Sequence, residues 1–200
     1  MNAATHAYVS GAARRGTASG PAYRLNWAII HREAGRILLV SEGLSDPFIA
    51  RLEPSVGFGL ELVLETDGTA LPADNIELER NWWPSTLLKR VLDEVVIHEH
   101  VREGAKEGLL VMDVAGDAMP TALVGKEGRV AVLLGLESRL LPRDFPTSFG
   151  DVRLVPVKVL LPSEREYLEK RGAQGPTELA RRFVQTGEAH ISSASRPAVV

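Results

Sequence analysis

Apolar and polar residues alternate with a period of two in one stretch of the first half of the chain. The apolar positions are Phe58, Leu60, Leu62 and Leu64, separated by Gly59, Glu61, Val63 and Glu65. This period predicts a β-strand that buries one face. An earlier run, "RILLVSEG", is continuously apolar from Ile37 to Val40 and ends at Gly43. It predicts a strand buried on both faces.

The longest helical pattern is "PSTLLKRVLDEVVIHEHVREG", which predicts one long helix. Pro84 suits its first turn, and Gly104 is expected to end it. Its apolar side chains form two adjacent rows: Leu88, Leu92 and Val96, and Leu87, Val91 and Val95.

Strand patterns dominate after residue 108, in "GLLVMDVA", "TALVG", "RVAVLLGLE" and "VRLVPVKVLL". The glycine-bearing joint at 125–128 predicts a hairpin. Ser163 and Glu166 have the spacing of a capping box for a helix that ends near Arg171. A last amphipathic helix is predicted at 176–186, with Leu179 and Phe183 on its apolar face.

This order of elements predicts an α/β domain of the α+β type, with a mixed, mainly antiparallel sheet packed with helices. A single domain is expected at 23–191. The segments 1–22 and 192–200 contain few large apolar side chains. Since they bury too little surface to offset the entropy of ordering, we expect both to be flexible tails.

Composition narrows the functional classes. The 200 residues are 44% hydrophobic, enough for one core. With 23 basic and 26 acidic residues and a net charge of −3, neither nucleic acid nor a membrane surface is expected as a partner. No run suits a membrane span or signal peptide, so we expect a cytoplasmic protein. The absence of cysteine excludes disulfides, thiolate metal sites and a thiol nucleophile.

Two catalytic templates fail around the predicted strands. A phosphate loop needs glycines at a strand-to-helix junction, whereas Gly57 and Gly59 precede a strand pattern. They are expected to allow close approach of another backbone or of a bulky side chain, or to admit a bulge. A hydrolase elbow needs Gly-x-Ser-x-Gly, but "GLSDP" places Pro47 where the last glycine belongs. We expect Ser45 to serve a turn instead.

The sequence "HEH" at residues 98–100 resembles a fragment of a metal-binding site. Side chains two residues apart on a helix point about 200° apart and cannot hold one ion together. Glu94 and His98 are one turn apart, and a solvated pair near the helix C-terminus is the favoured interpretation. Asp113 and Asp117 resemble paired carboxylates, but the glycine and proline near them favour a turn.

Two of the three tryptophans stand together in "NWWP", just before the long helix. Because large aromatic side chains are mostly buried, core packing is favoured for Trp82 and Trp83. The alternative is that one of them is exposed at a patch for a partner or for self-association. The sequence pattern assigns no residue to partner binding.

Read together, "GLSDP" at 43–47 and "GFGLELVLE" at 57–65 resemble the N-terminal domain of the Suppressor of fused family. The matching residues are Gly43, Leu44, Ser45, Asp46, Gly57, Phe58, Gly59, Glu61 and Leu62. The sequence "WWPSTLLKRVLDEVV" is similar to the family's Trp-Pro helix through Trp83 and Pro84. The likeness covers about residues 36–187, a length typical of one domain.

The resemblance implies a protein-binding domain without enzymatic activity, metal, cofactor or small-molecule substrate. The family's two-domain members hold a peptide between their domains, whereas this chain matches the first domain only. Single-domain bacterial members are associated with immunity proteins that neutralise toxins. The resemblance therefore implies an antitoxin-like protein whose partner is another protein, here a toxin.

A different class stays open as the alternative. A hydrolase or metal-dependent enzyme would use Ser45 or the cluster of Glu94, His98 and His100. It is motivated only by residue type and proximity. If the chain is instead a binding module, an open sheet edge could receive a strand of the partner, a mode that leaves little trace in the sequence.

Overall fold

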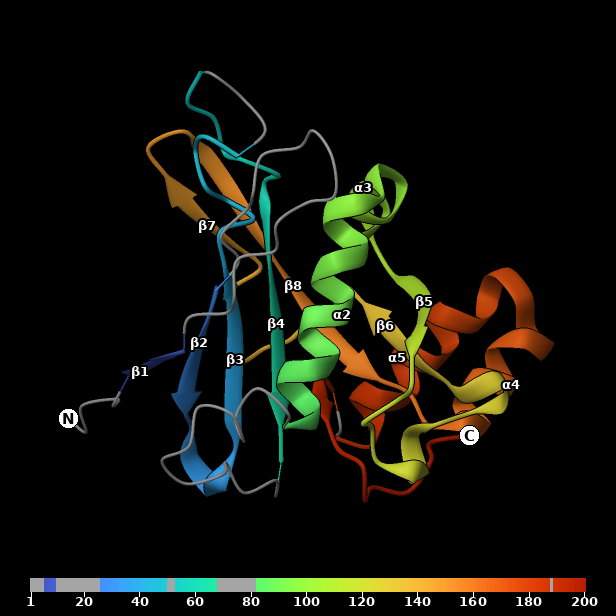
Figure 1. Cartoon of the computed structure of the whole chain (residues 1–200). Helices are drawn as coiled ribbons and strands as arrows, with labels where there is room; N and C mark the ends of the chain where they lie inside the picture. The colour runs from blue at the N-terminus through green and yellow to red at the C-terminus, as the bar shows by residue number, and fades with distance from the viewer. Residues whose placement is uncertain (1–5, 10–25, 50–52, 68–81, 188) are drawn as a thin grey trace.

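A computed structural model describes residues 6–9, 26–49, 53–67, 82–187 and 189–200. Its strands join into one mixed sheet with the order β1-β2-β3-β4-β8-β6-β5, with β7 paired to β8 and β9 paired to β4 (Figure 1). Within the described ranges the strands are β1 His6–Val9, β2 Asn26–His31, β3 Ile37–Glu42, β4 Leu60–Thr66, β5 Leu110–Ala115, β6 Arg129–Leu134, β7 Asp144–Thr147, β8 Gly150–Val159 and β9 Ile191–Ser192.

The sheet is mainly antiparallel, as the sequence predicts. Strand β4 pairs parallel with β8 and with β9, whereas the other described pairs are antiparallel. Helices cover the sheet, and their described bounds are α2 Trp83–Ile97, α3 Glu99–Glu107, α4 Pro162–Arg171 and α5 Gly175–Gln185. The fold is therefore of the expected α+β type.

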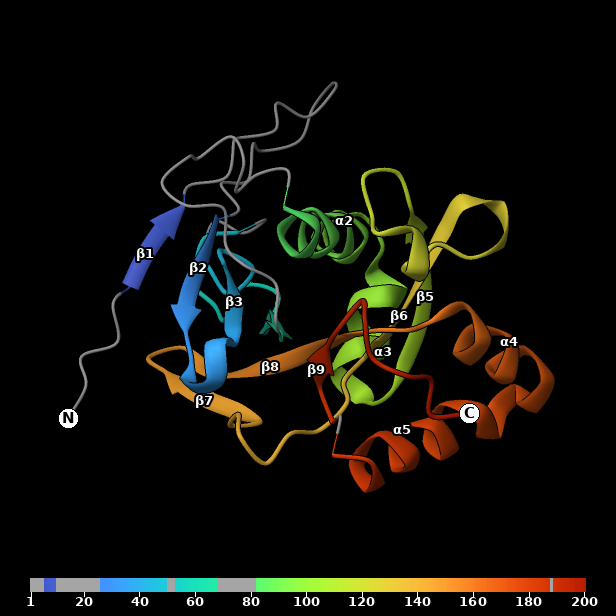
Figure 2. The ribbon, with the colours of Figure 1, turned by 90° about the horizontal axis from the view of Figure 1, so that it is seen from below.

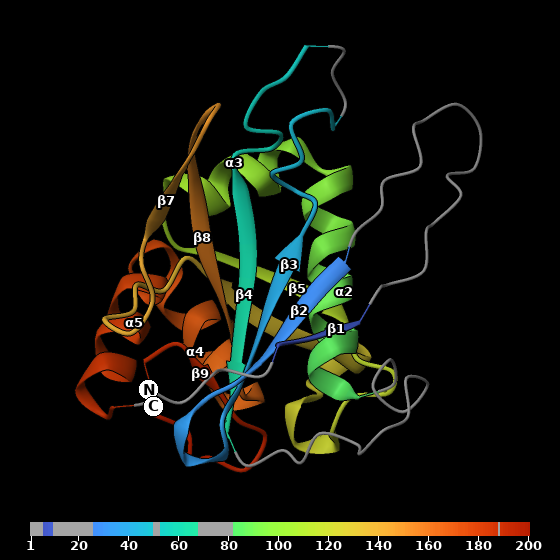
Figure 3. The ribbon, with the colours of Figure 1, turned by 90° about the vertical axis from the view of Figure 1, so that its left-hand side faces the viewer.

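Helices lie on both faces of the sheet. Helix α2 runs along one face, while α4 and α5 lie on the other (Figures 2 and 3). The larger core cluster packs α2 against the sheet and includes Leu62, Leu88 and Val157. A smaller cluster lies under α4 and α5, with Leu133 and Phe183 among its members. Two separate apolar layers thus hold the sheet between helices.

The predicted long helix is two helices. His98 has extended backbone angles (φ −112°, ψ 105°), so α2 ends before it and α3 starts after it. The change of direction brings Val101 and Ala105 into the larger core cluster. Gly104 does not end the helix but lies within α3, where the Leu110 side chain packs 3.6 Å from the position a Cβ would take. Tertiary packing therefore decided the break.

The strand predicted in "TALVG" is wrong. Residues Thr121–Leu123 form a short 3-10 helix, η2, and Lys126–Gly128 form another, η3. The antiparallel partner of β6 is β5, so the hairpin connection spans the whole segment between them. Leu123 is 1% exposed and Met119 is 8% exposed, so burial of these side chains in the core helps to hold this segment.

The capping of α4 also differs from the prediction. The carboxylate of Glu164, rather than that of Glu166, accepts a hydrogen bond from the backbone N–H of Leu161 at 2.8 Å. Glu166 pairs with Lys126 at 2.9 Å. The α5 prediction is confirmed, since Leu179 and Phe183 are fully buried.

The end of the chain does not run free of the domain, in contrast to the flexible tail expected at 192–200. Ser192, Ser193 and Arg196 are buried, and Arg196 bonds to Glu164 on α4. Polar contacts order this segment, which composition alone does not reveal. At the other end, β1 lies within the expected tail 1–22, and the remainder of that tail is outside the described residues.

Candidate protein-interaction site

The "GLSDP" turn is held by a buried carboxylate on β4. Glu61, only 3% exposed, accepts hydrogen bonds from the Ser45 hydroxyl at 2.6 Å and from the backbone N–H groups of Ser45 and Gly43 at 2.8 and 3.1 Å. Its second oxygen accepts from the Ser41 hydroxyl at 2.5 Å. The carboxylate thus satisfies two backbone donors that burial would otherwise leave unpaired.

The two halves of the sequence motif meet at Gly57. A Cβ at this residue would lie 2.6 Å from the Leu44 carbonyl oxygen and 2.7 Å from that of Asp46. Gly57 also has φ +61°, which disfavours residues with a side chain. The next residue, Phe58, donates its N–H to the Leu44 carbonyl at 2.7 Å. The prediction that a glycine here admits a close backbone is confirmed.

Burial raises the pKa of Glu61, and the hydrogen bonds from Ser41, Ser45 and Gly43 lower it without cancelling that effect. The Ser45 hydroxyl donates its hydrogen bond to this carboxylate. The same carboxylate also accepts hydrogen bonds from the Ser41 hydroxyl and from the N–H groups of Ser45 and Gly43. A nucleophilic serine needs a base that can take its proton during reaction. The geometry therefore gives Ser45 the role of a turn residue.

The candidate metal cluster is a surface pair. Glu94 and His98 approach to 3.2 Å, and their side chains are 39% and 46% exposed. The rings of His98 and His100 are tilted, with centroids 5.6 Å apart. Among the described residues, no group of three or more histidine, aspartate or glutamate side chains is placed to hold a metal ion.

The two candidate aspartates do not form a pair, because each binds a different arginine. Asp113 lies within β5 rather than in the predicted turn, and Arg165 bonds to both of its carboxylate oxygens at 2.9–3.2 Å. Asp117 follows the strand and binds Arg90 at 2.6 Å. Asp113 thus ties β5 to α4.

Both neighbouring tryptophans are buried, as core packing predicts. Trp82 is 6% exposed and Trp83 is 9% exposed, and both belong to the larger core cluster. The alternative of a self-association patch at either tryptophan is therefore wrong. Trp82 also accepts the Ser85 hydroxyl on its carbonyl at 2.8 Å, which closes the first turn of α2.

Strand β5 lies at one end of the sheet, far from β1 (Figure 2). It pairs with β6 on one side, and no described strand pairs with its other side. Gly116 donates to the Gly128 carbonyl, so residues in phase with Gly116 (Leu110, Met112 and Val114) direct their backbone groups toward β6. Val111, Asp113 and Ala115 then direct theirs outward.

Arginines already occupy part of this outer edge. The guanidinium of Arg129 donates to the Asp113 carbonyl, and that of Arg90 donates to the Ala115 carbonyl. Such capping protects a sheet edge from unwanted pairing. Within the described part of the chain, no hydrogen bond engages the outward groups of Val111. Among the outward residues of β5, Val111 is therefore the one whose backbone groups no arginine caps.

A cleft of about 200 Å³, lined by both charged and apolar residues, lies between β5 and α4. Asp113 and Arg129 line it from the strands, and Pro162 and Arg165 line it from α4. Strand side chains alternate between faces, so Val111 and Asp113 point to this same side of the sheet. An added strand would direct alternate side chains toward the cleft.

Sequence reasoning missed the burial of three glutamates in the described part of the chain. Glu61 and Glu65 occupy the polar positions of an alternating strand, yet both are buried, and Glu65 bonds to His190 at 2.8 Å. Glu164 is likewise buried against Arg196. A glutamate that faces solvent and one that faces a distant partner leave the same pattern in a sequence. Only the motif residues Gly43, Ser45 and Glu61 carried a usable signal.

No protein-family model matches the sequence, and a search of curated proteins finds no match. Solved structures do match: a crystal structure of the Sufu–Fu complex is 17% identical with a TM-score of 0.52, over 88% of this chain and 78% of that one. A crystal structure of Drosophila Suppressor of fused is 14% identical with a TM-score of 0.51, over 88% of this chain and 42% of that one. The predicted Suppressor of fused-like fold is confirmed.

Proposed function

We propose that this domain of Suppressor of fused-like fold is a protein-binding module that receives an extended segment of its partner at β5. The observation that carries the proposal is the outer edge of β5, where Val111 presents backbone donor and acceptor groups beyond the arginine-capped half. Main-chain hydrogen bonds to an added strand supply affinity, and pockets beside the edge supply specificity.

The cleft between β5 and α4 would provide that specificity. Its lining includes the apolar residues Leu160 and Pro162 and charged residues such as Arg129 and Glu166. A partner side chain with an apolar body and a polar end therefore fits it best. One of the solved structures with a similar fold is a complex, the Sufu–Fu complex. This similarity supports, in general terms, the binding of another protein.

We further propose that the partner is a toxin and that this chain is a cytoplasmic, non-enzymatic immunity protein. The support is the resemblance to single-domain bacterial members together with the roles of Ser45 and the Glu94–His98 pair, which are structural or solvated. None of the helices within the described ranges is long and apolar enough to cross a membrane.

The immunity role is tested by producing the toxin encoded beside this gene in cells, with and without this protein. Protection from killing is the expected result. Equal killing in both cultures would contradict the immunity role, and it would leave the fold and the β5 edge untouched. A gene neighbourhood of metabolic enzymes without a toxin gene would count against the role as well.

The edge itself is tested by replacing Val111 with proline. Proline removes the outward N–H, and a sheet edge tolerates it because no ladder bond to β6 is lost. We expect Val111→Pro to weaken binding of the toxin by about tenfold or more, measured by calorimetry. The matched control is Val111→Thr, which keeps the N–H and the β-branched shape. Equal affinities for the two variants would place the site elsewhere.

A further inference from the structure

The last described segment, residues 189–200, crosses the domain as an extended strap. We call it the C-terminal strap. It leaves the end of α5, passes between β4 and β8 as β9, and finishes beside α4 (Figures 1 and 2). Strand β4 pairs with β8 from Leu60 to Val63. Beyond that point, at Glu65 and Thr66, β4 pairs with β9 instead. The strap thus fills a slot where two strands diverge.

The first half of the strap is held by groups that recognise an extended backbone. Lys158 of β8 donates to the carbonyl of Ile191, and the Ser192 hydroxyl accepts the N–H of Val159 at 2.9 Å. His190, 1% exposed, bonds to Glu65 at 2.8 Å. Each of these contacts joins the strap to the sheet through a side chain.

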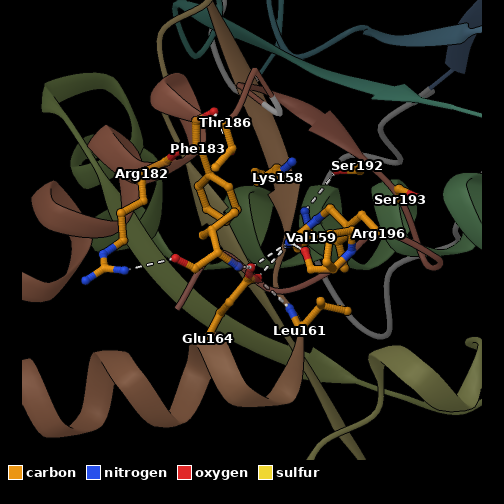
Figure 4. Close-up of polar contacts among 12 residues, drawn as sticks. Lys158, Val159, Leu161, Glu164, Arg182, Phe183, Thr186, Ser192, Ser193 and Arg196 are labelled. Atoms are coloured by element: carbon orange, nitrogen blue, oxygen red, sulfur yellow. Dashed lines mark hydrogen bonds and ion pairs between the residues drawn. The ribbon is translucent and has the colours of Figure 1, made fainter.

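The second half is held by one buried carboxylate (Figure 4). Glu164, 0% exposed, accepts from both terminal nitrogens of Arg196 at 2.5 and 2.6 Å and from the Val199 N–H at 3.2 Å. The Val199 carbonyl accepts from Arg182 of α5 at 3.0 Å. A two-nitrogen contact between a guanidinium and a carboxylate fixes direction and position together.

Polar contacts of this kind are well suited to exchange. The strap carries serines, alanines and a proline but few large apolar side chains, so it can pass through water at little hydrophobic cost. Its junction with α5 contains Gly187 at φ +78° and Ala189 at φ +40°. The left-handed angle of Ala189 is unfavourable for a residue with a side chain.

We propose that the slot is an acceptor for the strap of a second copy of this chain, so that two copies form a dimer by reciprocal strap exchange. A second copy presents the same His190, Ser192, Arg196 and Val199, and it therefore supplies every contact of the closed form. Exchange of an identical element is a low-cost route to a symmetric dimer, because it needs no new interface. Glu164 and Arg196 then pair between chains instead of within one.

Charge reversal at the Glu164–Arg196 pair distinguishes a strap bound to the slot of a second copy from a strap bound to the slot of its own chain. Glu164→Arg places two arginines together within one chain, and Arg196→Glu places two glutamates together. In a mixture of the two variants, exchange joins the arginine-bearing slot of the first to the glutamate-bearing strap of the second. The other half of the same dimer regains the native Glu164–Arg196 pair. We expect each variant alone to be a monomer of lowered melting temperature.

An equimolar mixture should form a 1:1 heterodimer in light scattering and recover most of the lost melting temperature. The control is the double variant Glu164→Arg/Arg196→Glu, which keeps an opposite-charge pair both within one chain and between two copies. It is therefore expected to match the unaltered protein in mass and melting temperature. A mixture that stays monomeric and melts like its components would overturn the proposal.

The test also covers the case in which a single variant does not fold. The two variants are then refolded together from urea, and the exchanged heterodimer is the expected folded species. If the double variant folds from urea while the mixed single variants yield no folded dimer, strap exchange is excluded.

Discussion

At the scale of single residues, buried glutamates bind segments that are distant in the sequence, Glu61 and Glu164 partly through backbone N–H groups and Glu65 through side chains. Glu61 serves the turn at Gly43–Ser45, Glu65 faces His190 and two arginines, and Glu164 serves the C-terminal strap. Glu61 and Glu65 lie on β4, and Glu164 lies in the first turn of α4. A buried carboxylate with several donors binds a loop more specifically than apolar packing does.

Replacement of Glu61 tests this role. Glu61→Ala leaves the N–H groups of Gly43 and Ser45 without an acceptor, and we expect it to lower the free energy of unfolding by roughly 3–5 kcal/mol. Glu61→Gln keeps one acceptor oxygen for the turn and should cost about 1–2 kcal/mol. Urea denaturation of both variants measures the difference. Similar losses for alanine and glutamine would show that side-chain volume matters rather than hydrogen bonding.

At the scale of elements, close contact between the 43–47 turn and the residues before β4 explains why the two parts of the motif occur together. Gly57 permits the approach of the turn, and Glu61 holds it four residues later. The turn and the strand are therefore one structural unit. Its sequence signature records a packing requirement, which is why it indicates a fold and does not by itself indicate chemistry.

Alanine substitution distinguishes the two glycines of this unit. Gly57→Ala adds a Cβ 2.6 Å from a carbonyl oxygen at a positive φ, so we expect a loss of about 3 kcal/mol or more in unfolding free energy. Gly59→Ala also has a positive φ, but its nearest neighbour is a Val56 methyl at 3.6 Å. Its expected cost is about 1 kcal/mol. Comparable losses at both positions would rule out the close approach as the cause.

At the scale of the whole molecule, distant parts of the chain meet around Glu65 of β4. Arg36 lies 3.1 Å and Arg32 3.6 Å from one oxygen of this carboxylate, and His190 bonds to the other. Burial raises the pKa of Glu65, but the hydrogen bond and charge of His190 and the charges of both arginines outweigh it and lower the pKa. The β2–β3 connection and the strap are thereby joined to the central strand.

This network predicts a loss of stability in acid. Because the folded pKa of Glu65 lies below its ordinary value of 4.5, its contribution is complete above that value and is lost as the pH falls through the folded pKa. Glu65→Gln should lower unfolding free energy by about 2 kcal/mol near pH 7 and flatten the acid dependence. Urea titrations at several pH values measure both effects. An unchanged acid dependence in Glu65→Gln would assign it to other carboxyl groups.

The sequence predicted those features that arise from local pattern. The apolar rows located α2, and Leu179 with Phe183 located α5, because each helix buries a face with its own period. Alternation located β4, but the burial of one face that it predicts is wrong, because all seven residues of β4 are buried. Prediction from sequence pattern failed at His98, where the predicted helix breaks, and at Thr121–Leu123, where the predicted strand is a 3-10 helix. At both places packing against other elements overrides the local preference. The parallel pairing of β4 with β8 is likewise invisible in either strand alone.

Pattern and motif along the chain were enough to predict the α+β class, the main helices, the burial of both tryptophans and the Suppressor of fused-like fold. Three features emerged only from the folded chain: β5 lies at an open edge, three glutamates are buried, and residues 189–200 form a strap. The difference lies in how far apart along the chain the interacting residues are. Periodicity records which face of an element is buried, whereas edges and buried ion pairs depend on residues far apart in the chain, such as Glu65 and His190.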